Sequence, residues 1–342
     1  MAGRHPHAVR FGKSWLIAVP NGDRLLHFDE QLNALPSLPI PTPTEPVFPA
    51  VTAHPDRSKV AVAHATGLRV YACQPAHGQA YLLWEVLHQP WEKFARPACT
   101  FDDSSRLWWV RPGPDRSADR VAVLDPQTGE VLAAADLAPT GYSYQLVIHP
   151  RGGAAVVEGS AGQDEAIFWR AELGPTGLSV AQLNTDDRVM GGFSPDGTRF
   201  VTAPHASGDP VMIHRWPDAF VLDRLDALSV FLDEREVSSG QPDDFDYQAV
   251  FVGGRHVLID TWQRRLLLLR TDPLELIAEL WPEGYELVAY GDRGQPVAES
   301  EAVVSYEGDL STWTIAGEHL LTLHRTGRLC LWDLAAAQAE VL

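Results

Sequence analysis

The sequence predicts an all-β protein built from repeated antiparallel sheets, and two observations support this fold class. One short pattern recurs about seven times: an apolar run enters a turn of Gly, Pro or Asp, and a second and a third β-rich run follow across further turns. The first turns also recur at similar intervals. They lie at Gly12, Pro55, Asp102, Pro150, Pro195, Gly253 and Gly317, which are 43, 47, 48, 45, 58 and 64 residues apart.

The repeat period fits one architecture. The chain has 342 residues, which leaves about 49 per copy, enough for four short strands and their turns. A period of about 40 to 50 residues with several strands per copy is typical of a β-propeller. We therefore expect a seven-bladed β-propeller with four-stranded antiparallel blades, and a single domain over residues 1–342.

Each copy contains segments with strand-like composition. The clearest copy has its first turn at 192–197, its second strand at 199–202 and its third at 211–216. Other second strands are expected at 59–64, 106–110 and 319–323, and other third strands at 69–71, 120–124, 166–169 and 328–332. A fourth strand follows turns such as 125–129, because Pro and Gly supply the backbone angles of a turn. The first strand begins near residues 7–11, and the chain ends in a fourth strand near 338–342.

Composition predicts a bacterial, cytoplasmic protein. Residues 1–11 lack the apolar core of a signal peptide, and no apolar run approaches the roughly 18 residues that span a bilayer. Cys73, Cys99 and Cys330 have no metal-type spacing, so we expect buried thiols in a reducing compartment. Arg strongly outnumbers Lys among the 27 basic residues, which is typical of GC-rich bacterial genomes.

Two motifs carry a resemblance to a known family. The segment Leu331-Trp332-Asp333-Leu334 closes a third strand, and Phe193-Ser194-Pro195-Asp196-Gly197 opens a copy. With these motifs the chain resembles the WD40-repeat family of seven-bladed propellers. The Trp-Asp pair occurs only in the last copy, and the Gly-His dipeptide of the family is missing. The resemblance implies that the loops from each fourth strand to the next first strand lie on one rim.

Charge is concentrated in two inserts. The formal net charge is −18, and the inserts at 226–246 and 282–311 each carry a net charge of −6. Both follow an expected fourth strand, so we expect one strongly acidic rim. Its field would repel nucleic acid and anionic membranes and attract a basic partner. The alternative is that these loops only keep a large β-protein soluble.

Aromatic residues occur in the same class of loop, and aromatic anchors ringed by charge are typical of protein-binding surfaces. The alternative for each ring is that it packs beneath its own loop. The expected partner-binding residues are Trp91, Phe94, Tyr142, Tyr144, Phe231, Asp243, Asp244, Asp246 and Tyr285.

A second hypothesis uses the residues at the ends of the second strands. His64, Glu158, His205, Asp260 and His324 occupy similar positions in five copies. Imidazole and carboxylate groups suit a divalent metal ion, and such a site would serve a metal-assisted hydrolase or lactonase. The alternative is that each residue caps its own hairpin.

The other common catalytic and cofactor motifs are missing from the sequence. We therefore expect no cofactor and a non-enzymatic platform that binds a protein or peptide. The metal-assisted hydrolase and a purely structural module remain as alternatives.

Overall fold

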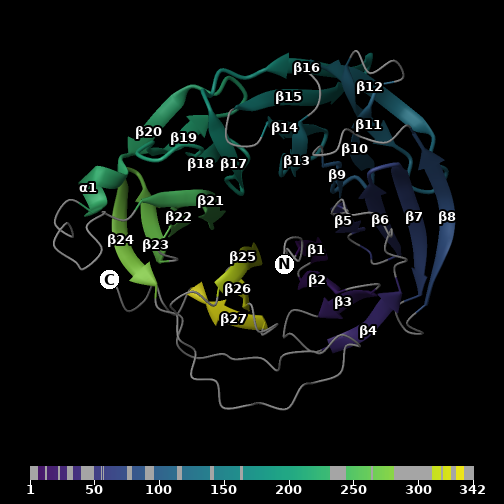
Figure 1. Ribbon diagram of the computed structural model, residues 1–342, viewed down its shortest axis with the longest axis horizontal. Coiled ribbons are helices and arrows are strands. Elements are labelled where there is room, and N and C mark those ends of the chain that lie inside the picture. The colour runs from purple at the N-terminus through teal and green to yellow at the C-terminus, as the bar shows by residue number, and fades with distance from the viewer. Residues whose placement is uncertain are drawn as a thin grey trace. The chain divides into compact units, whose positions relative to one another are not determined.

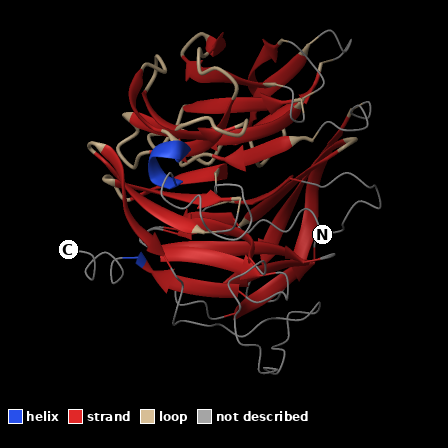
Figure 2. Cartoon of the chain, turned by 60° about the vertical axis from the view of Figure 1, so that its left-hand side comes forward, coloured by secondary structure: helices blue, strands red, loops and turns tan. Residues whose placement is uncertain are grey.

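A computed structural model shows an all-β chain of repeated antiparallel sheets (Figure 1). It describes residues 7–11, 14–21, 24–28, 34–39, 50–54, 56, 58–74, 79–88, 96–113, 118–138, 142–161, 165–231, 244–262, 265–280, 310–316, 319–324 and 329–334. These residues form six sheets of four strands and one of three. Strands dominate the cartoon in Figure 2, and α1 (Ala227–Phe231) is a short helix among them. The prediction of repeated four-stranded antiparallel sheets is confirmed.

The chain divides into two compact units, and unit 1 comprises the described parts of Met1–Asp164 together with Phe168–Gln182. Each of its four sheets joins strands that are consecutive in the sequence. The strands are β1 (His7–Phe11), β2 (Ser14–Asn21), β3 (Arg24–Phe28), β4 (Ala34–Pro39), β5 (Ala50–Ala53), β6 (Lys59–His64), β7 (Gly67–Gln74), β8 (Gln79–Leu87), β9 (Ala98–Phe101), β10 (Leu107–Pro112), β11 (Asp119–Leu124), β12 (Val131–Leu137), β13 (Ser143–Ile148), β14 (Ala154–Ser160), β15 (Ala166–Gly174) and β16 (Gly177–Gln182).

Unit 2 comprises Glu165–Ile167 and the described parts of Leu183–Ala289 and Val297–Leu342. It contains two four-stranded sheets and a sheet of which three strands are described. The strands are β17 (Arg188–Phe193), β18 (Arg199–Pro204), β19 (Val211–Arg215), β20 (Val221–Leu225), β21 (Phe245–Val252), β22 (His256–Thr261), β23 (Leu266–Thr271), β24 (Leu274–Leu280), β25 (Leu310–Ala316), β26 (His319–His324) and β27 (Leu329–Asp333).

The strand boundaries confirm the expected positions of the turns. In each of the seven sheets, the predicted first turn falls between the first and the second strand. The insert at 226–246 follows the fourth strand β20, and the insert at 282–311 follows the fourth strand β24. The expected strand at 338–342 lies outside the described residues.

The core of unit 1 lies between neighbouring sheets. Leu107 and Trp109 of β10 share one face of their strand, and they pack with Ala61 of β6 and Leu68 of β7. All four side chains are buried. Burying a large apolar side chain stabilises the fold by about 1.5–3 kcal/mol, so this contact holds the β5–β8 and β9–β12 sheets together.

In unit 2, β23 shows why an unbroken apolar run is required. Leu267 and Leu269 belong to one hydrophobic cluster, which includes residues of β18 and β19. Leu266 and Leu268 face the other way into a second cluster, with Trp313 of β25 and Cys330 of β27. Both faces of the β21–β24 sheet are therefore covered by other sheets, as the continuous apolar segments predict.

Buried polar groups organise the turn between β9 and β10. The carboxylate of Asp102 accepts hydrogen bonds from the main-chain nitrogens of Ser104 and Arg106, each 2.9 Å away. It also accepts bonds from Nε of Arg106 at 2.8 Å and from Nε1 of Trp108 at 3.0 Å. The turn that the sequence marks with Asp102 is therefore held by this one carboxylate.

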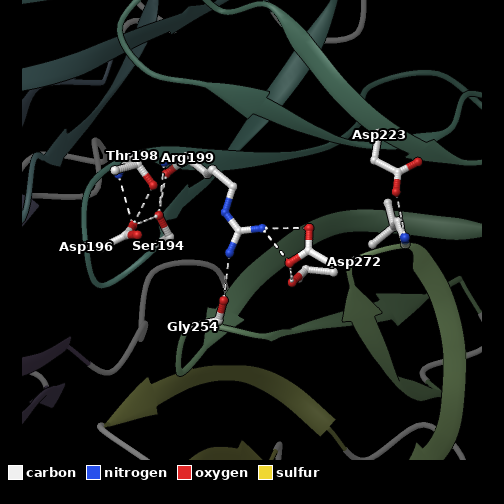
Figure 3. A network of polar contacts seen from close by, with 9 residues as sticks. Ser194, Asp196, Thr198, Arg199, Asp223, Gly254 and Asp272 are labelled. Atoms are coloured by element: carbon white, nitrogen blue, oxygen red, sulfur yellow. Dashed lines mark hydrogen bonds and ion pairs between the residues drawn. The ribbon is translucent and has the colours of Figure 1, made fainter.

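Arg199 links two sheets of unit 2 (Figure 3). Its guanidinium extends from β18 and donates to both carboxylate oxygens of Asp272, at 3.1 and 3.3 Å, and to the main-chain oxygen of Gly254 at 2.7 Å. Beside it, Asp196 in the turn before β18 accepts hydrogen bonds from Ser194 and Thr198. The β17–β18 turn is thus held by its own side chains, while Arg199 joins it to the β21–β24 sheet.

The described helices include none that is long and apolar enough to cross a membrane. Cys73, Cys99 and Cys330 are buried. Burial raises the pKa of the Cys73 and Cys99 thiols to about 12, so both remain protonated at neutral pH.

Candidate functional site

Four strand ends meet at one edge of unit 2. Because β17 and β18 are antiparallel, the start of β17 lies beside the end of β18, where Arg188 pairs with Pro204. The start of β21 likewise lies beside the end of β22, where Phe245 pairs with Thr261. Contacts between the two sheets place these ends together. We define the acidic-aromatic surface as Asp186, Asp187, His205, Asp209, Asp246, Tyr247 and Trp262.

His205 is the buried member of this set, and it contacts two of the others. Its Nδ1 lies 2.8 Å from Oδ1 of Asp187, and its ring centroid lies 6.1 Å from that of Tyr247. Asp187 also accepts a hydrogen bond of 2.7 Å from the main-chain nitrogen of Ala166. A carboxylate, an imidazole and an aromatic ring are therefore in contact across two sheets.

Asp244 fixes the loops beneath the surface. Its Oδ2 accepts hydrogen bonds of 2.7 Å from the Ser207 hydroxyl and from the Gly208 main-chain nitrogen. Its main-chain oxygen accepts a bond of 3.0 Å from the nitrogen of Trp262. Asp244 is buried, so it ties together the loop after β18, the start of β21 and the end of β22.

A buried cation lies below the acids. Arg188 is almost fully buried, and its guanidinium donates to Thr202 Oγ1 at 3.2 Å and to the Pro210 main-chain oxygen. Burial lowers the pKa of Arg188 to about 10, while the charges of Asp209, Asp186 and Asp187 act in the opposite direction. These carboxylates are exposed or half-buried, so the acids face solvent and the arginine does not.

Two aromatic side chains remain exposed beside these acids. The side chain of Tyr247 is 43% exposed and that of Trp262 is 51% exposed. Neither residue is among the partner-binding residues expected from the sequence. Their positions in the sequence could have indicated them. Tyr247 directly follows the acidic segment that ends at Asp246, and Trp262 follows the last residue of a second strand.

Tyr142 and Tyr144, two expected partner-binding residues, lie in the interior of unit 1. Both rings are buried and pack on Trp169, at centroid distances of 6.2 and 6.5 Å. The Tyr144 hydroxyl donates a hydrogen bond of 2.6 Å to Asp119. Burial and this carboxylate raise the pKa of Tyr144 far above its usual value. The two rings contribute to the core.

Of the other expected partner-binding residues, Asp244 and Phe231 are buried. Phe231 is buried against Phe245, at a centroid distance of 5.8 Å, whereas Asp246 is half-buried at the surface. Trp91, Phe94, Asp243 and Tyr285 lie outside the described residues.

Three residues of the metal hypothesis, His64, His205 and Asp260, have described side-chain partners. His64 and Glu158 belong to unit 1, and His64 Nδ1 lies 3.0 Å from the hydroxyl of Thr66. His205 and Asp260 belong to unit 2, where Asp260 accepts a hydrogen bond of 3.1 Å from Nε1 of Trp313. His324 is described only as part of β26. Within the described ranges, no group of three or more His, Cys, Asp or Glu residues could hold a metal ion.

Comparison with known proteins assigns no family. No protein-family model matches the chain, and a search of curated proteins found no match.

Proposed function

We propose that this chain is a non-enzymatic, seven-bladed β-propeller of the WD40-repeat type that binds a protein or peptide with a basic surface. The seven antiparallel sheets in regular succession support the propeller. The acidic-aromatic surface supports binding and carries the proposal. There, Tyr247 and Trp262 are exposed near the same strand ends as the four carboxylates of this surface.

The chemistry of the surface selects the class of partner. Exposed aromatic rings provide a large contact area, and they are enriched among the residues that dominate binding energy. The surrounding carboxylates favour Lys and Arg on the partner and speed its association. Asp233 and Glu236 belong to the same insert but lie outside the described residues, and they add to its net negative charge.

The fixed loops also favour binding. Asp244 and Asp187 anchor the backbone around the surface through hydrogen bonds. A surface held in place before association loses less conformational entropy when the partner binds. The site therefore resembles a rigid platform more than a mobile loop.

Fluorescence anisotropy with labelled peptides tests the proposal. The probes are a Lys/Arg-rich peptide that contains aliphatic residues and an acidic peptide of the same length. We expect the basic peptide alone to bind, with an affinity that falls as salt is added, because the Debye length shortens to about 8 Å at physiological ionic strength.

Two pairs of variants locate the binding. Tyr247→Ser with Trp262→Ser is expected to abolish binding, whereas Phe220→Ser, which removes an exposed ring elsewhere in unit 2, leaves it unchanged. Asp186→Asn with Asp246→Asn is expected to weaken binding mainly at low salt. Asp218→Asn is the matched control, because Asp218 is paired with Arg215. Equal affinity for all four proteins would refute the assignment to this surface.

A further inference from the structure

In unit 1, β10 carries two buried N–H donors that have no acceptor among the described residues. Trp109 and Arg111 are two residues apart and therefore lie on one face of the strand. Trp109 is 0% exposed. Within the described part of the chain, neither Nε1 of Trp109 nor Nε of Arg111 has a hydrogen-bond partner. Buried polar groups in native structures are nearly always paired, so two adjacent exceptions require an explanation.

The side chains of Arg111 and Trp109 lie close together. The guanidinium carbon of Arg111 lies 5.6 Å from the centroid of the Trp109 ring. The His88 ring lies 5.6 Å from the same indole, and the main-chain nitrogen of His88 donates to Thr66 after β6. The two donor side chains of β10 and the His88 ring of the neighbouring sheet are therefore grouped together.

The charge of Arg111 is not balanced by a described carboxylate. Its cross-strand neighbour on β11 is another cation, Arg120. Nε of Arg120 donates a hydrogen bond of 2.5 Å to Asp136, so Arg120 has an anionic partner and Arg111 has none in the described ranges. Burial lowers the pKa of Arg111, and the charge of Arg120 acts in the same direction.

From this geometry we infer that the Arg111–Trp109 pair binds a small carboxylate anion. A carboxylate supplies the missing charge and presents two coplanar oxygens, which match the planar donors of a guanidinium. The indole N–H is a further donor for one of these oxygens. The surroundings are apolar, since Trp109 packs with Ala63 and Leu68. One unpaired cation in such surroundings favours a singly charged ligand over a doubly charged phosphate.

This site is independent of the proposed partner surface, because all its residues belong to unit 1. The test is a titration with sodium acetate at constant ionic strength, balanced with sodium chloride, and followed by calorimetry and by the unfolding temperature. Sodium phosphate and sodium chloride alone are the comparison titrations. A ligand that binds only the folded protein raises its unfolding temperature in a saturable way.

The matched variants are Arg111→Gln and Arg120→Gln. We expect Arg111→Gln to weaken acetate binding at least about tenfold and Arg120→Gln to change it by less than about twofold. Trp109→Phe keeps an aromatic ring but removes the indole N–H donor, so it should weaken binding less than Arg111→Gln does. Near-ultraviolet circular dichroism checks that each variant is folded. If Arg111→Gln does not fold, Arg111→Lys replaces it, since lysine keeps the charge and lacks the planar donors.

Three outcomes would overturn the inference. The first is an acetate response in Arg111→Gln or Arg111→Lys equal to that of the unmodified chain. The second is a response that does not saturate and equals that of chloride, which indicates a general salt effect. The third is saturable binding of phosphate without binding of acetate, which would show that the carboxylate assignment is wrong.

Discussion

The imidazole of His214 stacks on the ring of Phe200, with the ring centroids 4.8 Å apart and an angle of 11° between the planes. Nδ1 of His214 lies 3.2 Å from the main-chain oxygen of Ala219. That oxygen can only accept, so Nδ1 carries the proton. Nε2 then accepts from the Thr202 hydroxyl at 3.0 Å, while Thr202 Oγ1 accepts from Arg188. The directed chain of hydrogen bonds requires a neutral His214.

This network predicts a loss of stability in acid. Burial lowers the pKa of His214 to about 4, and the charge of Arg188 acts in the same direction. Its pKa in the unfolded chain is about 6.5, so the unfolded state binds more protons once the pH falls below that value. The free energy of unfolding should fall by up to about 3 kcal/mol from this residue between about pH 6.5 and pH 4.

Urea unfolding at about pH 7 and about pH 4.5 measures this effect. His214→Gln should be less stable than the unmodified chain near neutral pH, and it should lose less stability on acidification. Phe200→Leu is the control, because it removes the stacked ring but keeps the titrating group. It should lower stability at both pH values and keep the pH dependence. An unchanged pH dependence in His214→Gln would contradict the assignment.

Asp102 supports a second prediction. Its carboxylate is buried and accepts bonds from Arg106 and from the buried indole of Trp108. Asp102→Ala leaves that indole without an acceptor and frees the guanidinium, so we expect a loss of about 3 kcal/mol in the free energy of unfolding. Denaturant unfolding followed by tryptophan fluorescence measures it.

The control for Asp102 is Asp218→Ala. Asp218 forms an ion pair with Arg215 on the surface, where solvent screens the interaction. The unfolding midpoint of this variant should stay close to that of the unmodified chain. Equal shifts for the two variants would mean that the Asp102 carboxylate does not hold the turn between β9 and β10.

The sequence predicted the sheets well because their signals are local. Gly, Pro and Asp at positions such as Asp102 and Pro195 form turns through neighbouring residues, and an apolar run such as Leu266–Leu269 reports burial on both faces. The contact of His205 with Tyr247 joins different sheets and depends on how they pack. The spacing of residues in the sequence therefore does not predict this contact. Likewise, the aromatic character of Tyr142 and Tyr144 does not show whether the rings turn outward or pack on Trp169.

The packing of β17 on β21 supports a final prediction. A Cβ atom at Gly191 would overlap the main-chain oxygen of Ala249 in β21, so Gly191→Ala must push two sheets of unit 2 apart. We expect a loss of about 2 kcal/mol in the free energy of unfolding. Gly254→Ala is the control, since a Cβ atom there meets nothing within 4 Å, and its stability should barely change. Denaturant unfolding of both variants measures these free energies. A Gly191→Ala chain as stable as the control would show that β17 and β21 do not approach this closely.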